Sequence, residues 1–448
     1  MEDIEGLKER ILSKKNQHDK NEFQAGVGLS RSWDPEDAGE EVIVSALENL
    51  SKKPKFVLLF STIHYAKERK GMKRFVNAAY DSLPEGTPLI GGTVAGFINN
   101  YGCFTRGATA LAVYYPNMDV AIGIGRNTKR APHLAAKQCA EMILKNQKQK
   151  YPTNFLLNII AGPTKPIFFG FGSHWVVKHS IMAKIGPKFL ELSVKYRQKG
   201  QGLEDDIIKY LADYMKDYII IGASSGDNNE LITNYQFVDK HVEKFSLVAM
   251  GLNTDLKIDF SHTDGLYPTG IKFKVTKTAQ GSRIVKELDG KPAARTFFER
   301  IGIPMDSLND RILRTTFFLP VCFRTNDGYM CPNAIGCVLK DYLAFNYSIK
   351  GTEIELFTTS GKDLIKAVSD AIESLKITKP KVGIIVSCLA RLETLGVNIY
   401  KVRDLLLRYF NSVPFLLVYS AGENIKFPNK EPHHFNETFN ILVATNEN

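Results

Sequence analysis

The chain has 448 residues, more than one hydrophobic core usually supports, so two domains are expected. Its composition, 44% hydrophobic and 24% charged, is that of a soluble globular protein, and no uncharged apolar run approaches the ~20 residues of a membrane span. The formal charge of +10 is spread along the chain. Even a local group such as Lys145, Lys148 and Lys150 lacks interleaved aromatic residues, which favours a solvated basic face over a nucleic-acid surface.

The first 22 residues are polar and carry charges of both signs. They lack the apolar core of a signal peptide, so a cytoplasmic location is predicted. The cysteines occur without CxxC pairs, and in a cytosolic chain they are expected to be reduced and mostly buried. They are Cys103, Cys139, Cys322, Cys331, Cys337 and Cys388.

A first unit of strands and helices follows this tail. Asp34 is a suitable N-cap and Pro35 a suitable first helical residue, which together predict where its first helix begins. The predicted order is strand 25–30, helix 35–50, strand 56–61, helix 72–83, strand 88–96, a hairpin of strands 108–114 and 118–124, and helix 133–145.

A second unit repeats this order with longer insertions, so an internal duplication is predicted in the N-terminal half. Its elements are strand 154–162, a helical region at 179–197, helix 207–215, strand 218–226, and a hairpin of strands 245–251 and 256–262. Turn residues cluster at 264–270 and indicate a domain boundary.

The C-terminal half mixes strands and helices. It is predicted to contain strands 271–276 and 282–288, a helix at 294–301, strands 318–324, 329–338, 342–349 and 353–358, helix 362–375, strand 382–388, helix 400–410, and strands 414–422 and 435–444. The expected fold class is therefore mixed α/β, with partly antiparallel sheets covered by helices. The expected division is a tail at 1–22, a domain at 23–265 and a domain at 266–448.

One nine-residue pattern occurs three times, at 88–96 (PLIGGTVAG), 218–226 (YIIIGASSG) and 414–422 (PFLLVYSAG). Apolar residues fill the second and third places, a small residue stands eighth and glycine ninth. The pattern is typical of a strand that ends in a tight turn. Three copies predict recurring units whose glycine turns meet at a site.

The strand end at 387–391 supplies the first candidate ligand-binding residues. Ligands commonly bind at such ends in α/β proteins, and Arg391 is a candidate to clamp a carboxylate; the alternative is a structural ion pair with Glu393, Glu423 or another acid. Glu423 is a candidate to hold a ligand amine. Cys388 is expected to be a small buried residue rather than a nucleophile, because no nearby motif supplies a base.

The other candidate residues lie within the nine-residue patterns or shortly after them in the chain. Adjacent His433 and His434 are expected to face opposite sides of a strand, so that only one lines a pocket. His434 is favoured, with Asn436 and Thr438 on its face. Hydroxyl and backbone N–H groups suited to an anion are expected at Gly92, Thr93, Ser224, Ser225 and Asp227, with tight turns of small residues as the alternative.

These segments resemble the FIST domain family, named for F-box and intracellular signal transduction proteins. The resemblance is carried by 25–30, 88–96, 287–293, 386–391, 420–423 and 434–438, in the order of the family's N- and C-terminal halves. It implies a sensory module that binds a small ligand such as an amino acid. Because few residues flank the module, a stand-alone, non-enzymatic sensor that signals to a separate partner protein is expected.

Three alternatives remain open. The resemblance also includes bacterial haem proteins that sense nitric oxide, for which His64, His174, His434 and Cys331 are conceivable axial ligands. No cofactor is otherwise expected. A protein-recognition scaffold without a small ligand and a thiol hydrolase that uses Cys388 are the other two possibilities.

Overall fold

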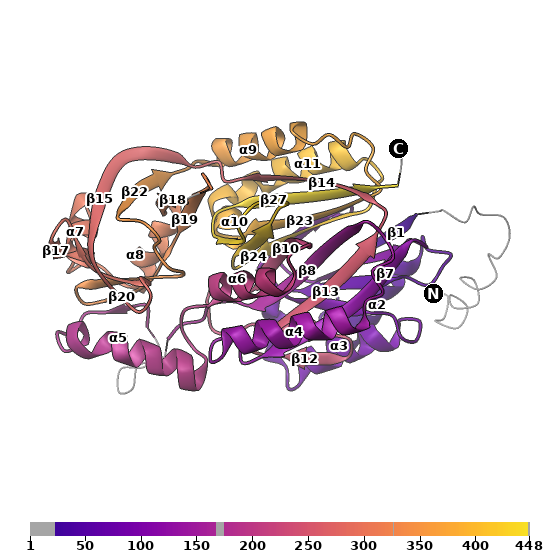
Figure 1. The fold of residues 1–448 in the computed structure, drawn as a ribbon, viewed down its shortest axis with the longest axis horizontal. Helices are drawn as coiled ribbons and strands as arrows, with labels where there is room; N and C mark the ends of the chain where they lie inside the picture. Colours follow the sequence, from indigo (N-terminus) through magenta and orange to yellow (C-terminus); the bar gives the residue numbers. More distant parts are fainter. Residues whose placement is uncertain (1–22, 167–173, 326, 447–448) are drawn as a thin grey trace.

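The computed structural model describes residues 23–166, 174–325 and 327–446, which fold into three similar repeats and one insertion (Figure 1). The first repeat contains β1 (Gln24–Ser30), α2 (Pro35–Leu47), β2 (Phe56–Ser61), η1 (Ile63–Lys67), α3 (Gly71–Asp81), β3 (Leu89–Thr93), β4 (Gly96–Asn99), β5 (Gly102–Phe104) and β6 (Ala108–Tyr114). The predicted polar tail, residues 1–22, lies outside the described residues.

The second repeat has the same order with additional helices. It contains β7 (Met118–Arg126), α4 (Pro132–Asn146), β8 (Thr153–Ala161), β9 (Val176–Val177), α5 (Met182–Leu192), η2 (Ser193–Arg197), α6 (Glu204–Tyr214), β10 (Ile219–Ser225), β11 (Gln236–Val238), β12 (His241–Glu243) and β13 (Ser246–Thr254).

The third repeat is divided by the insertion. It contains β14 (Lys257–Thr263), and, after the insertion, α9 (Gly361–Glu373), β23 (Val382–Cys388), α10 (Leu389–Leu395), η4 (Gly396–Asn398), α11 (Ile399–Phe410), β24 (Phe415–Ser420), β25 (Glu423–Lys426), β26 (His433–Phe435) and β27 (Phe439–Thr445).

Each repeat builds one sheet with the same strand order. The orders are β1-β6-β2-β3, β7-β13-β8-β10 and β14-β27-β23-β24, and the last two strands of each sheet are parallel. The short strands after each template strand then leave their own repeat. They extend a different sheet, so that β11-β12 join β3, β25-β26 join β10, and β4-β5 join β24. This exchange ties the three sheets into one body.

The three sheets face a common core, and helices cover their outer faces. The common core draws on each repeat, with Leu58, Ile221 and Leu416 among its fully buried side chains. Helices α2 and α3 pack on the first sheet, α4 and α6 on the second, and α9 and α11 on the third. Burial on both faces explains why strands such as β2 (FVLLFS) are apolar at all but the last position.

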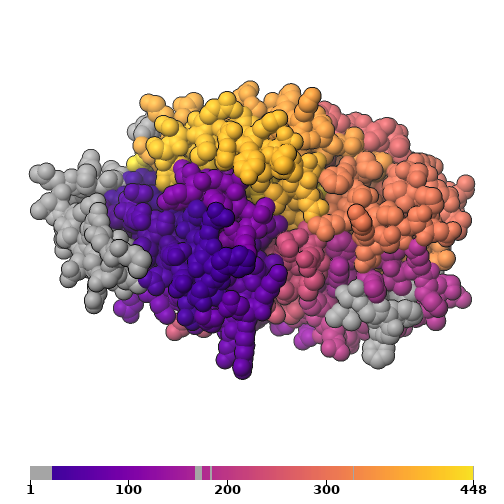
Figure 2. Space-filling view, turned by 180° about the vertical axis from the view of Figure 1, so that it is seen from behind, coloured from indigo at the N-terminus to yellow at the C-terminus, as the bar shows by residue number. Residues whose placement is uncertain are grey.

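The insertion, residues 267–358, forms one end of the molecule (Figure 2). It supplies most of a second core, to which Trp175, Leu231, Ile425, Phe427 and Phe435 of the repeats also contribute. Its elements are β15 (Tyr267–Ala279), β16 (Ile284–Leu288), β17 (Lys291–Pro292), α7 (Ala293–Arg300), α8 (Asp310–Arg314), η3 (Thr315–Phe318), β18 (Val321–Arg324), β19 (Met330–Asn333), β20 (Ile335–Leu339), β21 (Tyr342–Phe345) and β22 (Glu353–Thr358). Its sheet also takes in β9 of the second repeat, which pairs with β20. No helix of the described residues is long and apolar enough to cross a membrane.

The predicted fold class is confirmed, and the unit predicted twice is present three times. The two predicted hairpins are wrong: β6 pairs with β1 and β2, while β7 pairs with β13, and β13 and β14 likewise belong to different sheets. Residues 116–117 form a turn and residue 255 a bend between the strands on either side. They cannot specify the partner strand, which is decided by the sheet that buries each apolar face.

The two halves of the chain share sheets. Strand β14 lies before residue 265 and β27 lies at the C-terminus, yet they pair over seven residues, from Lys257 with Thr445 to Thr263 with Phe439. Strand β24 likewise pairs with β4 of the first repeat. The boundary expected at 265/266 therefore crosses a sheet, although it does coincide with the start of the insertion.

Candidate functional site

The three template turns meet, as their sequences predict. Backbone hydrogen bonds run from Ala95 N to Tyr419 O (2.9 Å), from Ala421 N to Ser224 O (2.9 Å) and from Gly226 N to Thr93 O (2.8 Å). They close a ring that links each repeat to the other two. We call this meeting point, residues 93–96, 224–226 and 420–423, the hub.

Most of the polar groups expected to bind an anion at the hub are already used by the fold. Thr93 Oγ1 accepts a hydrogen bond from Tyr235 N (3.0 Å), and a Cβ at Gly92 would lie 2.8 Å from Tyr235 O. Ser225 Oγ donates to Ile160 O (3.1 Å). Each group thus holds a neighbouring strand end, as in the tight-turn alternative.

The side chains of Asp227 and Ser224 differ in their hydrogen bonding. The Asp227 carboxylate accepts hydrogen bonds from the backbone N–H groups of Leu231 (2.8 Å) and Ile232 (2.7 Å), so it fixes the loop that follows β10. The buried Ser224 Oγ forms no hydrogen bond with any described residue.

Glu423 is buried beside β27. One carboxyl oxygen accepts from Thr438 N (3.2 Å) and Thr438 Oγ1 (2.9 Å), and the other accepts from Ser420 Oγ (3.1 Å). Burial raises the pKa of Glu423 to about 8 in spite of these bonds. The carboxyl is therefore largely protonated near neutral pH, which weakens its expected role as the partner of a ligand amine.

Glu437 is a second buried acid beside the hub that sequence analysis missed. Burial raises its pKa to about 8, and neither carboxyl oxygen has a hydrogen-bond partner among the described residues. Its backbone is left-handed (φ 61°), two residues before β27 begins.

Arg391 is almost fully buried, and its guanidinium donates to the backbone carbonyls of Asp264, Glu437 (3.2 Å) and Leu364 (3.4 Å). Its expected ion pair with Glu393 is absent, because Glu393 pairs with Arg314. These bonds join the end of β14 to α9 and to the start of β27. The arginine is thus positioned to hold three segments together rather than to meet a ligand.

Cys388 ends β23 and is buried, as predicted. Burial raises the pKa of its thiol well above the usual value, and the nearby Glu423 and Glu437 raise it further. The side chain packs with Ala390 and with Phe317 and Ala334 of the insertion. A thiol in this environment is a poor nucleophile.

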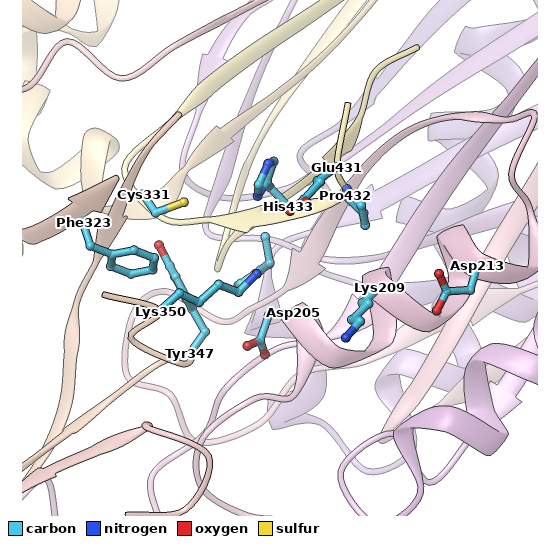
Figure 3. Close-up of a pocket in the computed structure, with 11 residues that line it drawn as sticks. Asp205, Lys209, Asp213, Phe323, Cys331, Tyr347, Lys350, Glu431, Pro432 and His433 are labelled. Carbon is cyan, nitrogen blue, oxygen red and sulfur yellow. The ribbon is translucent and has the colours of Figure 1, made fainter. Parts of the chain in front are cut away.

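A cleft of about 330 Å³ opens between α6, the insertion and the β25–β26 connection (Figure 3). Helical spacing of four places Asp205, Lys209 and Asp213 on one face of α6, which forms one wall. Figure 3 shows Phe323, Tyr347 and Lys350 on the opposite side. The complete lining is Asp205, Lys209, Asp213, Phe323, Cys331, Tyr347, Lys350, Glu431, Pro432, His433 and His434.

The cleft contains charges of both signs. Asp205 is paired with the buried Arg283 (2.5 Å). The side chains of Lys209, Lys350, Asp213 and Glu431, by contrast, form no ion pair or hydrogen bond with the described part of the chain. The charges of both lysines do oppose the rise in the pKa of Asp206 that burial causes. Lys209 and Asp213 have the same spacing as Lys366 and Asp370 of α9, which do pair, so the open pair in the cleft is not imposed by helix geometry.

Both adjacent histidines line this cleft, so the prediction that only one of them could is wrong. Strand β26 is a three-residue edge strand, too short to separate its two faces by a packed sheet. His433 Nε2 lies 2.9 Å from Asp327 Oδ2, and His434 Nδ1 lies 2.7 Å from Asn424 Oδ1. His434 is the candidate residue that the structure places in a cavity.

Asn436 and Thr438 do not share the cleft with His434. Asn436 bonds to the carbonyl of Ala421 (3.4 Å) and accepts from Asn346 Nδ2 (3.3 Å), while Thr438 bonds to Glu423. The left-handed residue Glu437 lies between His434 and Thr438 and interrupts the alternation of faces that the prediction for Thr438 assumed.

The family model for the FIST N domain matches residues 55–291, more than half of the chain and extending from β2 to β17. The chain belongs to the FIST family. No curated protein matches this FIST chain.

Two solved structures show only weak likeness to this FIST chain. The cyanuric acid hydrolase from A. caulinodans is 8% identical, with 53% of this chain and 72% of that chain covered and a TM-score of 0.26. PurLQS from Thermotoga maritima is 11% identical, with 96% and 74% covered and a TM-score of 0.20. Scores this low do not indicate a shared fold.

Several residues that line the cleft of this FIST chain could not be identified from the sequence. The acid–lysine–acid spacing on α6 was visible, but it is also typical of an ordinary solvated helix face. Lys350 and Tyr347 come from the insertion, more than 130 residues further along the chain. Of the four conceivable haem ligands, His434 and Cys331 line the cleft, whereas His64 and His174 do not. Burial raises the pKa of Cys331 to about 12, so this thiol stays protonated.

Proposed function

We propose that this FIST chain is a sensory protein that binds a small polar, amino-acid-like ligand in the cleft and signals to a separate protein. The supporting observation is that one cavity contains two ammonium groups, of Lys209 and Lys350, and two carboxylates, of Asp213 and Glu431, that form no ion pair or side-chain hydrogen bond with the described residues. A zwitterion has the complementary pair of charges. The volume of about 330 Å³ is at the small end of the range for ligand pockets.

The position of the cleft suits a sensor. One wall belongs to the second repeat through α6, and the opposite wall belongs to the insertion through Phe323, Tyr347 and Lys350. A ligand that contacts both walls binds best to one arrangement of the insertion relative to the repeats, and it therefore favours that arrangement. A partner protein that contacts the insertion would bind the two arrangements with different affinity. We propose a binding role without catalysis, since Cys388 is buried and protonated.

Thermal unfolding in the presence of each L-amino acid tests the proposal. A ligand that binds only the folded state raises Tm in a concentration-dependent way. Lys209→Met and Lys350→Met should each weaken binding roughly tenfold or more, because each removes a charge-assisted contact. Lys379→Met, an exposed lysine outside the cleft, is the matched control and should bind as the natural chain does.

Two results would overturn the proposal. One is that no amino acid raises Tm. The other is a shift that persists unchanged in the Lys209→Met/Lys350→Met double variant, because ligand would then bind away from these two lysines.

A further inference from the structure

His434 is connected to the centre of the second sheet by a relay of two buried amides. Its Nδ1 lies 2.7 Å from Asn424 Oδ1, Asn424 Nδ2 donates to Asn158 Oδ1 (3.0 Å), and Asn158 Nδ2 donates to Ile221 O (3.3 Å). Both asparagines are fully buried. The relay runs from the wall of the cleft through β25 to β8 and β10.

The last acceptor in the relay determines the orientation of every member. Ile221 O is a backbone carbonyl and can only accept, so Asn158 must present its NH₂ group there and its oxygen to Asn424. Asn424 must then donate with its NH₂ group and present its own oxygen to His434. Since that oxygen can only accept, Nδ1 of His434 carries the proton and Nε2 carries a lone pair.

Two glycines, which lack a Cβ, leave space for the side chains of Asn158 and His434. A Cβ at Gly222 would lie 2.3 Å from the amide atoms of Asn158. A Cβ at Gly422 would lie 2.4 Å from Cε1 and 2.8 Å from Nε2 of His434. On the cleft side, the ring of Tyr347 meets the imidazole edge-on, with 5.5 Å between the ring centroids. The imidazole is therefore held from both sides.

No described residue uses the Nε2 lone pair. Asp205 is the acid with the largest effect on the pKa of His434. If Asp205 accepted a hydrogen bond from Nε2, it would favour the opposite tautomer. Its oxygens instead accept hydrogen bonds from Arg283 Nη2 (2.5 Å) and Ser348 N (3.4 Å). Burial lowers the pKa of His434 to about 4, so the ring stays neutral near physiological pH. A neutral imidazole with Nδ1–H has one free function, which is to accept a hydrogen bond at Nε2.

We infer that His434 is the specificity-determining acceptor of the cleft: its Nε2 receives a hydrogen bond from an N–H or O–H donor of the ligand, such as the ammonium of an amino acid, while Asn424 and Asn158 are positioning residues that fix the tautomer. The ligand part of this inference rests on the proposed function. The tautomer does not, and it can be measured without any ligand.

Nitrogen-15 NMR of the histidine side chains of the full chain tests the tautomer. The His434 signals are assigned as those lost in His434→Asn, with His241→Asn, an exposed histidine on β12, as the control. The ligand-free protein should show a protonated Nδ1 and an unprotonated Nε2 across pH 6 to 8. A protonated Nε2 would overturn the inference. Asn158→Leu removes the amide that bonds to Ile221 and should allow both tautomers, whereas an unchanged spectrum would remove the relay as its cause.

Adding methylammonium or acetate during the NMR measurement tests whether Nε2 accepts a hydrogen bond, independently of which ligand the cleft binds. Methylammonium has donors and no carboxylate, so it should shift the Nε2 resonance of His434, while acetate should leave it in place. No response to methylammonium would overturn the acceptor role, whether or not an amino acid stabilises the protein. Conversely, a methylammonium response without stabilisation by any amino acid would leave the acceptor standing and refute the proposed function alone.

Side-chain replacements supply a second measure. His434→Gln places an amide oxygen near the position of Nε2, and His434→Asn keeps a polar group near Asn424 but none near Nε2. If an amino acid stabilises the natural chain, the Gln variant should retain more of that affinity than the Asn variant, by roughly tenfold. Equal affinities in the two variants would contradict the inference.

Discussion

The imidazole of His434 lies directly against the backbone of Gly422, so close that a Cβ there would be 2.4 Å from its Cε1. His434 lines the cleft, and Gly422 is the last residue of the third template, inside the hub. This contact joins the cleft to the point where the three repeats meet. The ninth-place glycine of the template is therefore required here for close approach of a ring rather than for an unusual backbone angle.

Gly422→Ala should displace the His434 ring and destabilise the protein by about 1–3 kcal/mol, the usual effect of adding a methyl group to a packed site. The free energy of unfolding in urea measures this. The matched control is Gly361→Ala at the first residue of α9, where the nearest atom to a Cβ is the end of the Asn398 side chain at 3.2 Å. Equal stability of the two variants would show that the ring can move without cost.

The two buried acids beside the hub predict a loss of stability as pH rises. Burial raises the pKa of Glu423 and Glu437 from 4.5 to about 8, so the folded state holds these protons more tightly than the unfolded state. The contribution is complete below about pH 4.5 and is lost as pH rises through about 8. His64 and His434, whose pKa burial lowers from 6.5 to about 4, act in the opposite sense, but only below about pH 6.5.

Between pH 6.5 and 8 the free energy of unfolding should therefore fall with rising pH, by on the order of 1 kcal/mol per pH unit. The double variant Glu423→Gln/Glu437→Gln should flatten this slope. Urea unfolding at several pH values compares the two proteins. A natural chain whose stability is constant over this range would show that the acids ionise without cost in the folded state.

Arg391→Met should destabilise the protein by about 3 kcal/mol or more, because it leaves the carbonyls of Asp264, Leu364 and Glu437 buried without a donor. Arg403→Met is the control, since Arg403 lies on α11 and its guanidinium contacts Asp404 and the ring of Tyr400 on the same helix. Chemical denaturation measures both. Ligand-induced stabilisation should persist in folded Arg391→Met, because Arg391 is not part of the cleft lining; its loss would restore the carboxylate-clamp hypothesis.

Asp227→Ala should loosen the loop over residues 228–234 by removing the acceptor of the N–H groups of Leu231, Ile232 and Thr233. We expect a loss of about 1–3 kcal/mol and faster cleavage of this loop in limited proteolysis. Asp81→Ala, an exposed acid at the end of α3, is the control. Unchanged proteolysis of the Asp227 variant would mean that the loop is held by other contacts.

Much of the fold follows from local sequence. Largely apolar runs such as 56–61 and 382–388 predicted β2 and β23 with their observed bounds, because a strand buried on both faces is apolar at most positions. The recurring glycine turns predicted the hub for a related reason. Only small residues allow three backbones to approach closely enough to exchange hydrogen bonds.

Which strands pair with each other could not be predicted from the sequence. The turn at 115–117 looks the same whether the strands on either side pair with each other or enter two sheets, and the predicted hairpin failed on this point. Glu437 was missed for a similar reason, since neither its burial nor its lack of partners is visible in a run of polar residues.

Local sequence thus accounts for the strands, the repeated template, the FIST family and the choice of His434 as a candidate. The recurrence of the template as three interlocked sheets, and the cleft that α6, the insertion and β26 enclose, are visible only in the folded chain. Apolar periodicity and turn chemistry act between near neighbours in the chain. A cavity is created where surfaces from Asp205, Lys350 and His434, far apart in sequence, remain unfilled after the sheets have packed.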